Sequence, residues 1–163
     1  MQQGFDGFPF PTRHHSKERN MLFNTVTVKI QRINKDFPLP VYATDGSACV
    51  DLMANIDKPL EMHQDRPYKI LTGIALSLPQ LYGAFVMPRS GLALKHGVTV
   101  VNTPGTIDSD FRGEISVILI NHRIVPFTIE PGMRIAQLTV MPVPRILWDE
   151  VDELDETARG KDG

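Results

Sequence analysis

Residues 25–33 read TVTVKIQRI, and this stretch decides the fold class because apolar and polar side chains alternate along it. Val26, Val28 and Ile30 fall on one side, whereas threonine, lysine and glutamine fall on the other. A period of two residues is typical of a strand with one buried face, since successive side chains of a strand point to opposite faces. We therefore expect a β-strand here.

Similar runs recur along the chain, separated by short segments rich in proline, glycine and asparagine. Only residues 90–95 and 147–154 have helical character, and both stretches are short. Many short strands with regular turn signals predict an all-β fold, a jelly-roll-like barrel or sandwich. Beyond residues 25–33, we expect strands at residues 68–78, 83–87, 98–101, 114–120 and 134–143.

The chain has 163 residues, which fits one domain of ordinary size. Residues 1–20 show no sustained period and contain several glycines and prolines, so we expect a flexible N-terminal extension. Residues 21–148 carry the β pattern, and residues 149–163 are expected to form a C-terminal arm. The arm begins with DEVDELDE, and without these six acids the rest of the chain holds 17 bases against 13 acids. This positive balance suits an anionic ligand.

Composition excludes several classes of protein. The net charge of −2 does not suit a general nucleic-acid coat protein, and the single cysteine, Cys49, excludes a disulfide framework and a cysteine-rich zinc site. No apolar run approaches the roughly 18–20 residues that cross a bilayer, and no apolar leader follows the N-terminus. We expect a soluble, cytoplasmic protein that binds neither membrane nor nucleic acid.

Four polar clusters interrupt the strands where turns are expected, and turns are where function usually sits. The second cluster ends a strand and opens a helix with Ser90 as its expected N-cap, and a helix N-terminus can bind phosphate. The fourth places Gln137 within an apolar strand, where an amide needs a hydrogen-bond partner. The clusters are GSACVDL at 46–52, PRSGLA at 88–93, NTPGTIDSDFRGE at 102–114 and GMRIAQL at 132–138.

Each cluster taken alone also fits a purely structural role. Asp51 could cap a turn, and Ser90 could serve only as a helix cap. Asp108 and Asp110 could form Asx turns, in which the side chain bonds to nearby backbone. Gln137 could bond to a neighbouring strand. No single cluster identifies an enzyme.

Taken together and in this order, the clusters resemble the motifs of the trimeric dUTP pyrophosphatases (dUTPases). The resemblance covers about residues 24–163. It implies a jelly-roll-like β-clip fold and a homotrimer whose active sites lie at subunit interfaces. The five motifs are similar to FPLPVYATDGSACVDL at 37–52, PRSGLA at 88–93, GTIDSDFRGE at 105–114, GMRIAQL at 132–138 and RG at 159–160.

The resemblance implies Mg²⁺-dependent hydrolysis of dUTP to dUMP and pyrophosphate, which keeps uracil out of DNA and supplies dUMP for dTMP synthesis. It assigns Asp108 to orient and deprotonate the water that attacks the α-phosphorus. Mg²⁺ would sit on the triphosphate, and Asp51 would reach it through water. The implied substrate-binding residues are Arg89, Ser90 and Gln137 at the phosphates, with Gly91 beside them, Asn102, Thr106 and Ile107 at uracil, Phe111 under the deoxyribose and Arg159 at the γ-phosphate.

Three features depart from the family pattern. Cys49 stands where the family usually has glycine, and Phe111 stands where tyrosine is commoner. Residues 161–163 follow the start of the fifth motif, where the family continues through a glycine-rich run to a phenylalanine that closes over the base. Either the sequence is trimmed or this lid is absent, and without a lid we expect reduced turnover.

Two other interpretations stay open. One is a dCTP deaminase, a related fold with overlapping motifs, which would release ammonia from dCTP. The other is a catalytically silent jelly-roll trimer that binds a nucleotide or a partner protein without cleaving dUTP. A weaker hypothesis makes residues 1–20 a regulatory or targeting arm.

Overall fold

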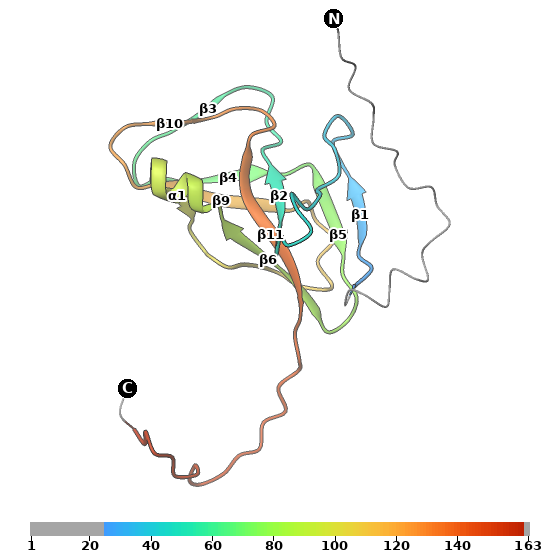
Figure 1. Ribbon diagram of the computed structural model, residues 1–163, viewed down its shortest axis with the longest axis vertical. Helices are drawn as coiled ribbons and strands as arrows, with labels where there is room; N and C mark the ends of the chain where they lie inside the picture. The colour runs from blue at the N-terminus through green and yellow to red at the C-terminus, as the bar shows by residue number, and fades with distance from the viewer. Residues whose placement is uncertain (1–24, 162–163) are drawn as a thin grey trace, which may run out of the picture.

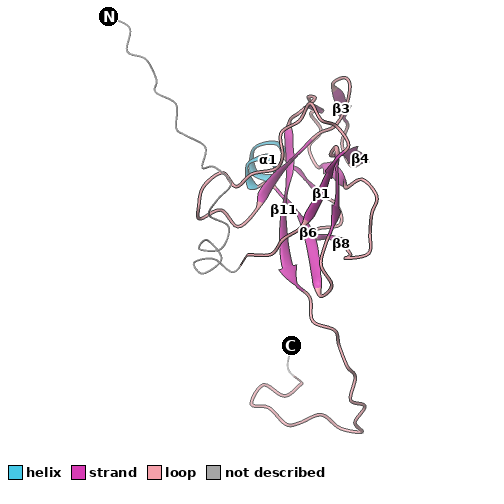
Figure 2. Cartoon of the chain, turned by 90° about the vertical axis from the view of Figure 1, so that its right-hand side faces the viewer, coloured by secondary structure: helices cyan, strands magenta, loops and turns pink. Residues whose placement is uncertain are grey.

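The computed structural model describes residues 25–161, and strands dominate this part of the chain (Figures 1 and 2). The predicted all-β class is confirmed, with one short helix among the described residues. The elements in chain order are β1 (Lys29–Arg32), β2 (Val50–Met53), β3 (Leu60–Met62), β4 (Pro67–Leu71), β5 (Ile74–Ser77), β6 (Tyr82–Pro88), α1 (Ser90–His96), β7 (Val98–Val100), β8 (Gly105–Ile107), β9 (Ser116–Asn121), β10 (Phe127–Ile129) and β11 (Arg134–Pro142).

The described strands form antiparallel sheets around a shared apolar core. The largest sheet has the order β2-β11-β6-β8, the next has the order β4-β9-β7, and the pairs β1-β5 and β10-β3 complete the set. Strand β9 alternates strictly, so that Val117 and Leu119 are buried and their neighbours are not. This alternation builds the core from one face of each strand.

The sequence pattern located most strands but overestimated their length. Of residues 25–33, only Lys29–Arg32 pair with a neighbouring strand, β5. The predicted strand at 68–78 is two strands, because Gly73 adopts a left-handed backbone (φ 74°) and turns the chain between them. Strands β2, β3, β8 and β10 were not among the predicted strands, and each has only three or four residues, which gives a weak period.

The predicted helix at residues 90–95 is confirmed as α1, which begins at Ser90 and ends one residue later than predicted, at His96. Arg89, with extended backbone, occupies the N-cap position, and Ser90 is the first helical residue, so the expected capping role of Ser90 is wrong. The helix ends at Gly97, whose left-handed φ of 66° lets its N–H donate to the carbonyl of Ala93.

The predicted helix at residues 147–154 is wrong. These residues belong to an irregular arm that leaves the end of β11 and runs away from the sheets in both views (Figures 1 and 2). Leu147, Trp148 and Leu154 are 95%, 83% and 87% exposed. An eight-residue helix without tertiary packing cannot offset the cost of nucleation, and its neighbouring acids repel one another.

The predicted N-terminal extension, residues 1–20, lies outside the described residues. The predicted boundary between the β domain and the arm, at residues 148 and 149, falls six residues after the end of β11 and stays a prediction. Within residues 25–161 no helix has the length and apolar character that a membrane crossing requires.

Candidate active site

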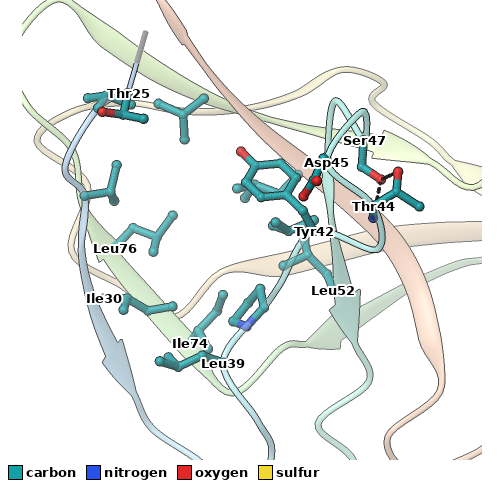
Figure 3. A pocket seen from close by; sticks show the side chains of 16 residues that line it. Thr25, Ile30, Leu39, Tyr42, Thr44, Asp45, Ser47, Leu52, Ile74 and Leu76 are labelled. Carbon is teal, nitrogen blue, oxygen red and sulfur yellow. Dashed lines mark hydrogen bonds between the residues drawn. The ribbon is translucent and has the colours of Figure 1, made fainter. Parts of the chain in front are cut away.

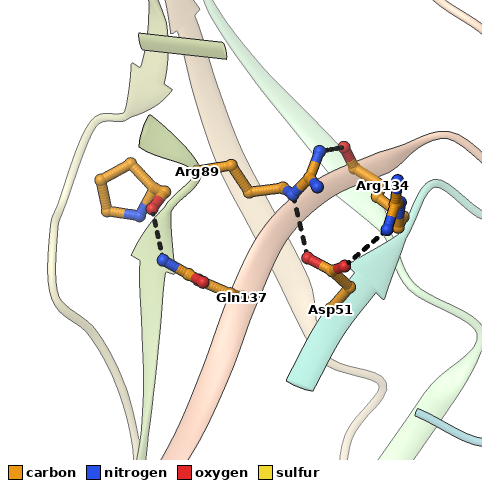
Figure 4. Close-up of polar contacts among 5 residues, drawn as sticks. Asp51, Arg89, Arg134 and Gln137 are labelled. Carbon is orange, nitrogen blue, oxygen red and sulfur yellow. Dashed lines mark hydrogen bonds and ion pairs between the residues drawn. The ribbon is translucent and has the colours of Figure 1, made fainter. Parts of the chain in front are cut away.

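Asp51 joins the first, second and fourth polar clusters (Figure 4). Its Oδ1 accepts a hydrogen bond from Nε of Arg89 at 2.9 Å, and its Oδ2 accepts one from Nη1 of Arg134 at 3.2 Å. Nη1 of Arg89 also donates to the backbone carbonyl of Arg134 at 3.2 Å. Two guanidinium groups around one carboxylate leave a net positive cluster, which suits an anionic ligand.

Gln137 lies on the strand next to Asp51. The two residues are register partners across β2 and β11, so both point away from the core that Leu52 and Leu138 enter. The Gln137 amide donates through Nε2 to the carbonyl of Pro88 at 3.0 Å, on the other neighbouring strand. The structure therefore confirms that Gln137 bonds to a neighbouring strand. The bonded carbonyl belongs to Pro88, the residue before Arg89.

Arg134 is a site residue that the sequence did not reveal. Strict alternation along β11 would put Arg134 and Gln137 on opposite faces. The register shifts between Arg134 and Ala136, and Ile135 and Ala136 are both buried, which marks a β-bulge. The extra residue returns Arg134 to the face of Gln137 and Asp51.

Ser90 and Gly91 open helix α1 directly after Arg89, and both are exposed. A Cβ added at Gly91 would meet nothing within 4 Å in this chain, so the space beside the first helical turn is open. Cys49, two residues before Asp51, is half-buried. Burial raises the pKa of its thiol, and the negative charge of Asp51 adds to this effect.

The third cluster forms a separate group of predicted site residues. Gly105, Thr106 and Ile107 make up β8 and pair with β6 at Val86, Phe85 and Ala84. The Asn102 amide lies over this strand, since a Cβ on Gly105 would come within 3.5 Å of its Nδ2. The cluster also contains a cis peptide bond before Pro104.

Asp108 and Phe111 follow β8 on an exposed turn. The N–H of Phe111 donates to the carbonyl of Asp108 at 3.2 Å. Within the described residues the carboxylate of Asp108 has no hydrogen bond or ion pair, so the expected alternative of an Asx turn is not formed there. Phe111 is 43% exposed, and its ring lies beside Gly113.

One chain keeps these two groups apart. Ile107 pairs with Ala84, near one end of β6, whereas Arg89 follows the other end at Pro88. Five residues of strand separate the level of Asp108 from Pro88, which is roughly 16 Å at the usual rise per residue. Arg159 lies on the arm beyond β11. The structure therefore brings Asp51, Arg89 and Gln137 together but leaves Asp108, Phe111 and Arg159 elsewhere.

Within residues 25–161 no group of three or more histidine, cysteine, aspartate or glutamate side chains could hold a metal ion. A single half-buried carboxylate, Asp51, lies beside the arginines. Mg²⁺ usually keeps several waters and is held by one or two carboxylates together with substrate phosphates. The donor set therefore fits a magnesium ion that arrives on a phosphorylated substrate.

A mostly apolar pocket of about 710 Å³ lies on another face of the domain, between β1, β5 and residues 39–52 (Figure 3). Ile30 and Leu76 line one side, and Tyr42 and Asp45 line the other. None of the predicted catalytic or substrate-binding residues lines this pocket. The apolar lining of this pocket and the exposed apolar residues of the arm are two apolar surfaces that the described residues leave accessible.

The fold and the positive cluster define a small jelly-roll-like protein suited to a phosphorylated ligand. The family model described as dUTPase matches residues 35–163. The deoxyuridine 5'-triphosphate nucleotidohydrolase of Dictyoglomus turgidum is 52% identical over 140 residues, which is 85% of this chain and 95% of that protein. The protein of the same name from Rickettsia canadensis is 53% identical over 136 residues, 83% of this chain and 92% of its own. The chain belongs to the dUTPase family.

Solved structures with a similar fold include two phage dUTPases. A mutant dUTPase of Staphylococcus aureus phage phi11, described with a structural Mg(II) ion, has a TM-score of 0.71 at 18% identity, covering 80% of this chain and all of that one. The dUTPase of Staphylococcus bacteriophage 80alpha with dUPNHPP has a TM-score of 0.75 at 22% identity, covering 85% and 96%. These structures confirm the predicted jelly-roll-like fold.

Proposed function

We propose that this protein hydrolyses dUTP to dUMP and pyrophosphate, with Mg²⁺, at sites shared between the subunits of a homotrimer. Membership of the dUTPase family and about 50% identity to named nucleotidohydrolases carry the activity. The dCTP deaminase and the silent trimer are not favoured by these relatives. The predicted cytoplasmic location stays a prediction.

The cluster around Asp51 is proposed to hold the phosphates. Arg89 and Arg134 supply two guanidinium groups, and Asp51 fixes both in place through one hydrogen bond each. Ser90 and Gly91 offer a hydroxyl and backbone N–H groups at the open helix start, and Gln137 holds the Pro88 carbonyl that precedes them. Phosphoryl transfer depends mainly on positioning and charge neutralisation, so a preformed positive cluster supports this assignment.

Mg²⁺ bound to the triphosphate oxygens would neutralise charge and order the phosphate chain. Asp51 is the residue proposed to reach it, through a bound water. Its two oxygens each accept one arginine hydrogen bond and keep further lone pairs for water.

Asp108 is proposed to orient the attacking water and take its proton at a carboxylate oxygen. The absence of any partner for this carboxylate within residues 25–161 supports the role, because a general base must be free to bond the water. The water attacks the α-phosphorus, the bond from that phosphorus to the bridging oxygen breaks, and pyrophosphate leaves. Arg159 is proposed to approach the γ-phosphate.

The strand β8 is proposed to recognise uracil. Backbone groups of Thr106 and Ile107 and the nearby Asn102 amide can match the uracil edge. Cytosine would present a donor in place of the O4 acceptor, which would leave buried groups unpaired. Phe111 is proposed to pack beneath the deoxyribose and exclude a 2′-hydroxyl.

The trimer is proposed because one chain does not assemble this machinery. Asp108 lies roughly 16 Å along β6 from the phosphate cluster, too far to serve a nucleotide bound there in the same copy. The arm also carries exposed apolar residues, among them Ile146, Leu147 and Trp148. Packing the arm against a neighbouring copy would cover this apolar surface.

Pyrophosphate release from dUTP by the 163-residue chain tests the activity, with and without Mg²⁺. We expect hydrolysis that depends on Mg²⁺, no ammonia from dCTP, and loss of turnover in Asp108→Asn with dUTP binding retained. Asp110→Asn is the matched control, since it removes a carboxylate from the same turn. Ammonia release from dCTP, or binding of dUTP without cleavage, would contradict the proposed activity.

A further inference from the structure

The segment that carries Asp108 is shaped by hydrogen bonds within itself. Besides the turn between Phe111 and Asp108, Nη1 of Arg112 donates to the carbonyls of Ser109 at 2.7 Å and Phe111 at 2.8 Å. These bonds give residues 108–112 a defined turn. None of these three bonds reaches the rest of the domain, although Arg112 lines a small pocket with residues of β1 and β5. The hydrogen bonds that join the segment to the domain lie at its two ends.

The two ends are attached in different ways. The preceding strand, β8, is held by its ladder with β6. At the following end, Oε1 of Glu114 accepts hydrogen bonds from the N–H of Gly73 at 2.7 Å and from Nδ2 of Asn55 at 3.2 Å. The next residue, Ile115, continues the attachment through backbone bonds to Ile74 and Thr72.

Glu114 is thereby linked to three other segments of the chain. The carbonyl of Gly73 accepts from the N–H groups of Ile33 at 2.7 Å and Asn34 at 3.1 Å. Nδ2 of Asn34 donates to Oδ1 of Asn55 at 2.8 Å, and Asn55 in turn reaches Glu114. A half-buried carboxylate that gathers a backbone N–H and a side-chain amide fixes its own backbone against the turn between β4 and β5.

We infer that Glu114 is a positioning residue that sets where Asp108 stands, an inference that rests on the proposed role of Asp108. Among residues 25–161, the side chain of Glu114 forms its hydrogen bonds with Asn55 and Gly73 and with no residue of β8 or of the cluster around Asp51. It acts through the six-residue segment that ends at Asp108. A displaced general base slows the chemical step, whereas the uracil contacts on β8 keep their own anchor. Loss of Glu114 should therefore lower kcat more than it raises KM.

The test compares Glu114→Ala with Glu114→Gln. Alanine removes both acceptor bonds, and we expect kcat to fall about tenfold to a hundredfold with KM changed by less than about threefold. Glutamine keeps an Oε1 that accepts both bonds, so Glu114→Gln should recover most of kcat. Equal losses in the two variants, or wild-type kcat in Glu114→Ala, would overturn the inference.

Thr72→Val is the matched control for stability alone. It removes the bond from Oγ1 of Thr72 to the carbonyl of Ile115 at 2.8 Å, while the backbone bond between the same residues stays. We expect Thr72→Val to lower the melting temperature with kcat unchanged. If kcat falls in step with melting temperature in every variant, Glu114 has only a structural role and the inference is wrong.

Two further variants keep the test decisive. Asn55→Ala replaces Glu114→Ala in the test if Glu114→Ala does not fold. It removes one of the two hydrogen bonds to Glu114, so kcat should fall by less, with the same small effect on KM. Asp108→Asn is measured beside them. Full activity in Asp108→Asn would refute the proposed catalytic role, whereas an inactive Asp108→Asn with an unimpaired Glu114→Ala would refute the positioning role alone.

Discussion

Nε of Arg89 and Oδ1 of Asp51 meet at 2.9 Å although 38 residues separate them in the chain. Arg134 binds the other oxygen of the same carboxylate, so one aspartate aligns two cations. The pair is only partly buried, and its direct contribution to stability is expected to be about 1 kcal/mol or less. Its value to the protein therefore lies in the placement of positive charge.

Asp51→Asn tests this placement. The substitution keeps the shape but removes the charge and one acceptor, so we expect the Mg²⁺ concentration for half-maximal activity to rise several-fold, with melting temperature nearly unchanged. A Mg²⁺ titration of dUTP hydrolysis measures the effect. Asp45→Asn is the control, because this exposed acid lies outside the arginine cluster. An unchanged Mg²⁺ requirement in Asp51→Asn would refute the proposed role.

Gln137→Leu removes the hydrogen bond that Nε2 of Gln137 donates to the carbonyl oxygen of Pro88 at 3.0 Å. We expect a loss of about 1 kcal/mol in the free energy of unfolding, because the carbonyl loses a partner. We also expect a several-fold rise in KM, because Arg89 and Ser90 follow this carbonyl directly. Thr139→Val, two residues along β11, should leave KM unchanged. Equal KM values in both variants would count against the role of Gln137.

The β-bulge in β11 shows what the sequence could not predict. Alternation located β6, β9 and β11 and thereby the all-β fold, because those strands are six to nine residues long and bury one face. It could not place Arg134 beside Asp51, because the bulge reverses the alternation at Ile135. Helical character in residues 147–154 was misleading because Leu147, Trp148 and Leu154 stay exposed in the part of the chain that the structure describes, so no apolar packing supports a helix there. Local pattern fixes which face a residue takes only where the register is unbroken.

Gly113→Ala tests whether the position of the Phe111 ring beside Gly113 determines recognition of the deoxyribose. A Cβ at Gly113 would come within 2.6 Å of Cζ of Phe111, so the ring must move. We expect weaker discrimination against UTP relative to dUTP, measured as the ratio of kcat/KM values, by about tenfold. Gly46→Ala is the control, since its added methyl would meet nothing within 4 Å. If Gly113→Ala discriminates between dUTP and UTP as well as the unaltered protein does, the Phe111 ring has no role in sugar recognition.

Cys49 supplies a pH prediction. Burial, together with the charge of Asp51, raises the pKa of this thiol, so the native state disfavours the thiolate. The raised pKa adds to the free energy of unfolding at pH values below the ordinary cysteine pKa. This contribution is lost as pH rises through the raised pKa. We expect slow alkylation by iodoacetamide at pH 8 and faster alkylation in Asp51→Asn, which loses one cause of the shift. Equal rates in the two proteins would show that Asp51 does not act on Cys49.

The sharing of sites between copies can be tested by mixing two inactive chains. Asp108→Asn lacks the proposed base, and Arg89→Ala lacks a phosphate ligand, but each keeps the part that the other has lost. If one site takes these residues from different copies, random co-assembly should restore both in about one site in four, and activity should return to about a quarter of wild type. The double variant, Arg89→Ala with Asp108→Asn on one chain, should stay inactive alone. Because a site built within one copy can never regain both residues, co-assembled mixtures without activity would place Asp108 and Arg89 in the same protomer.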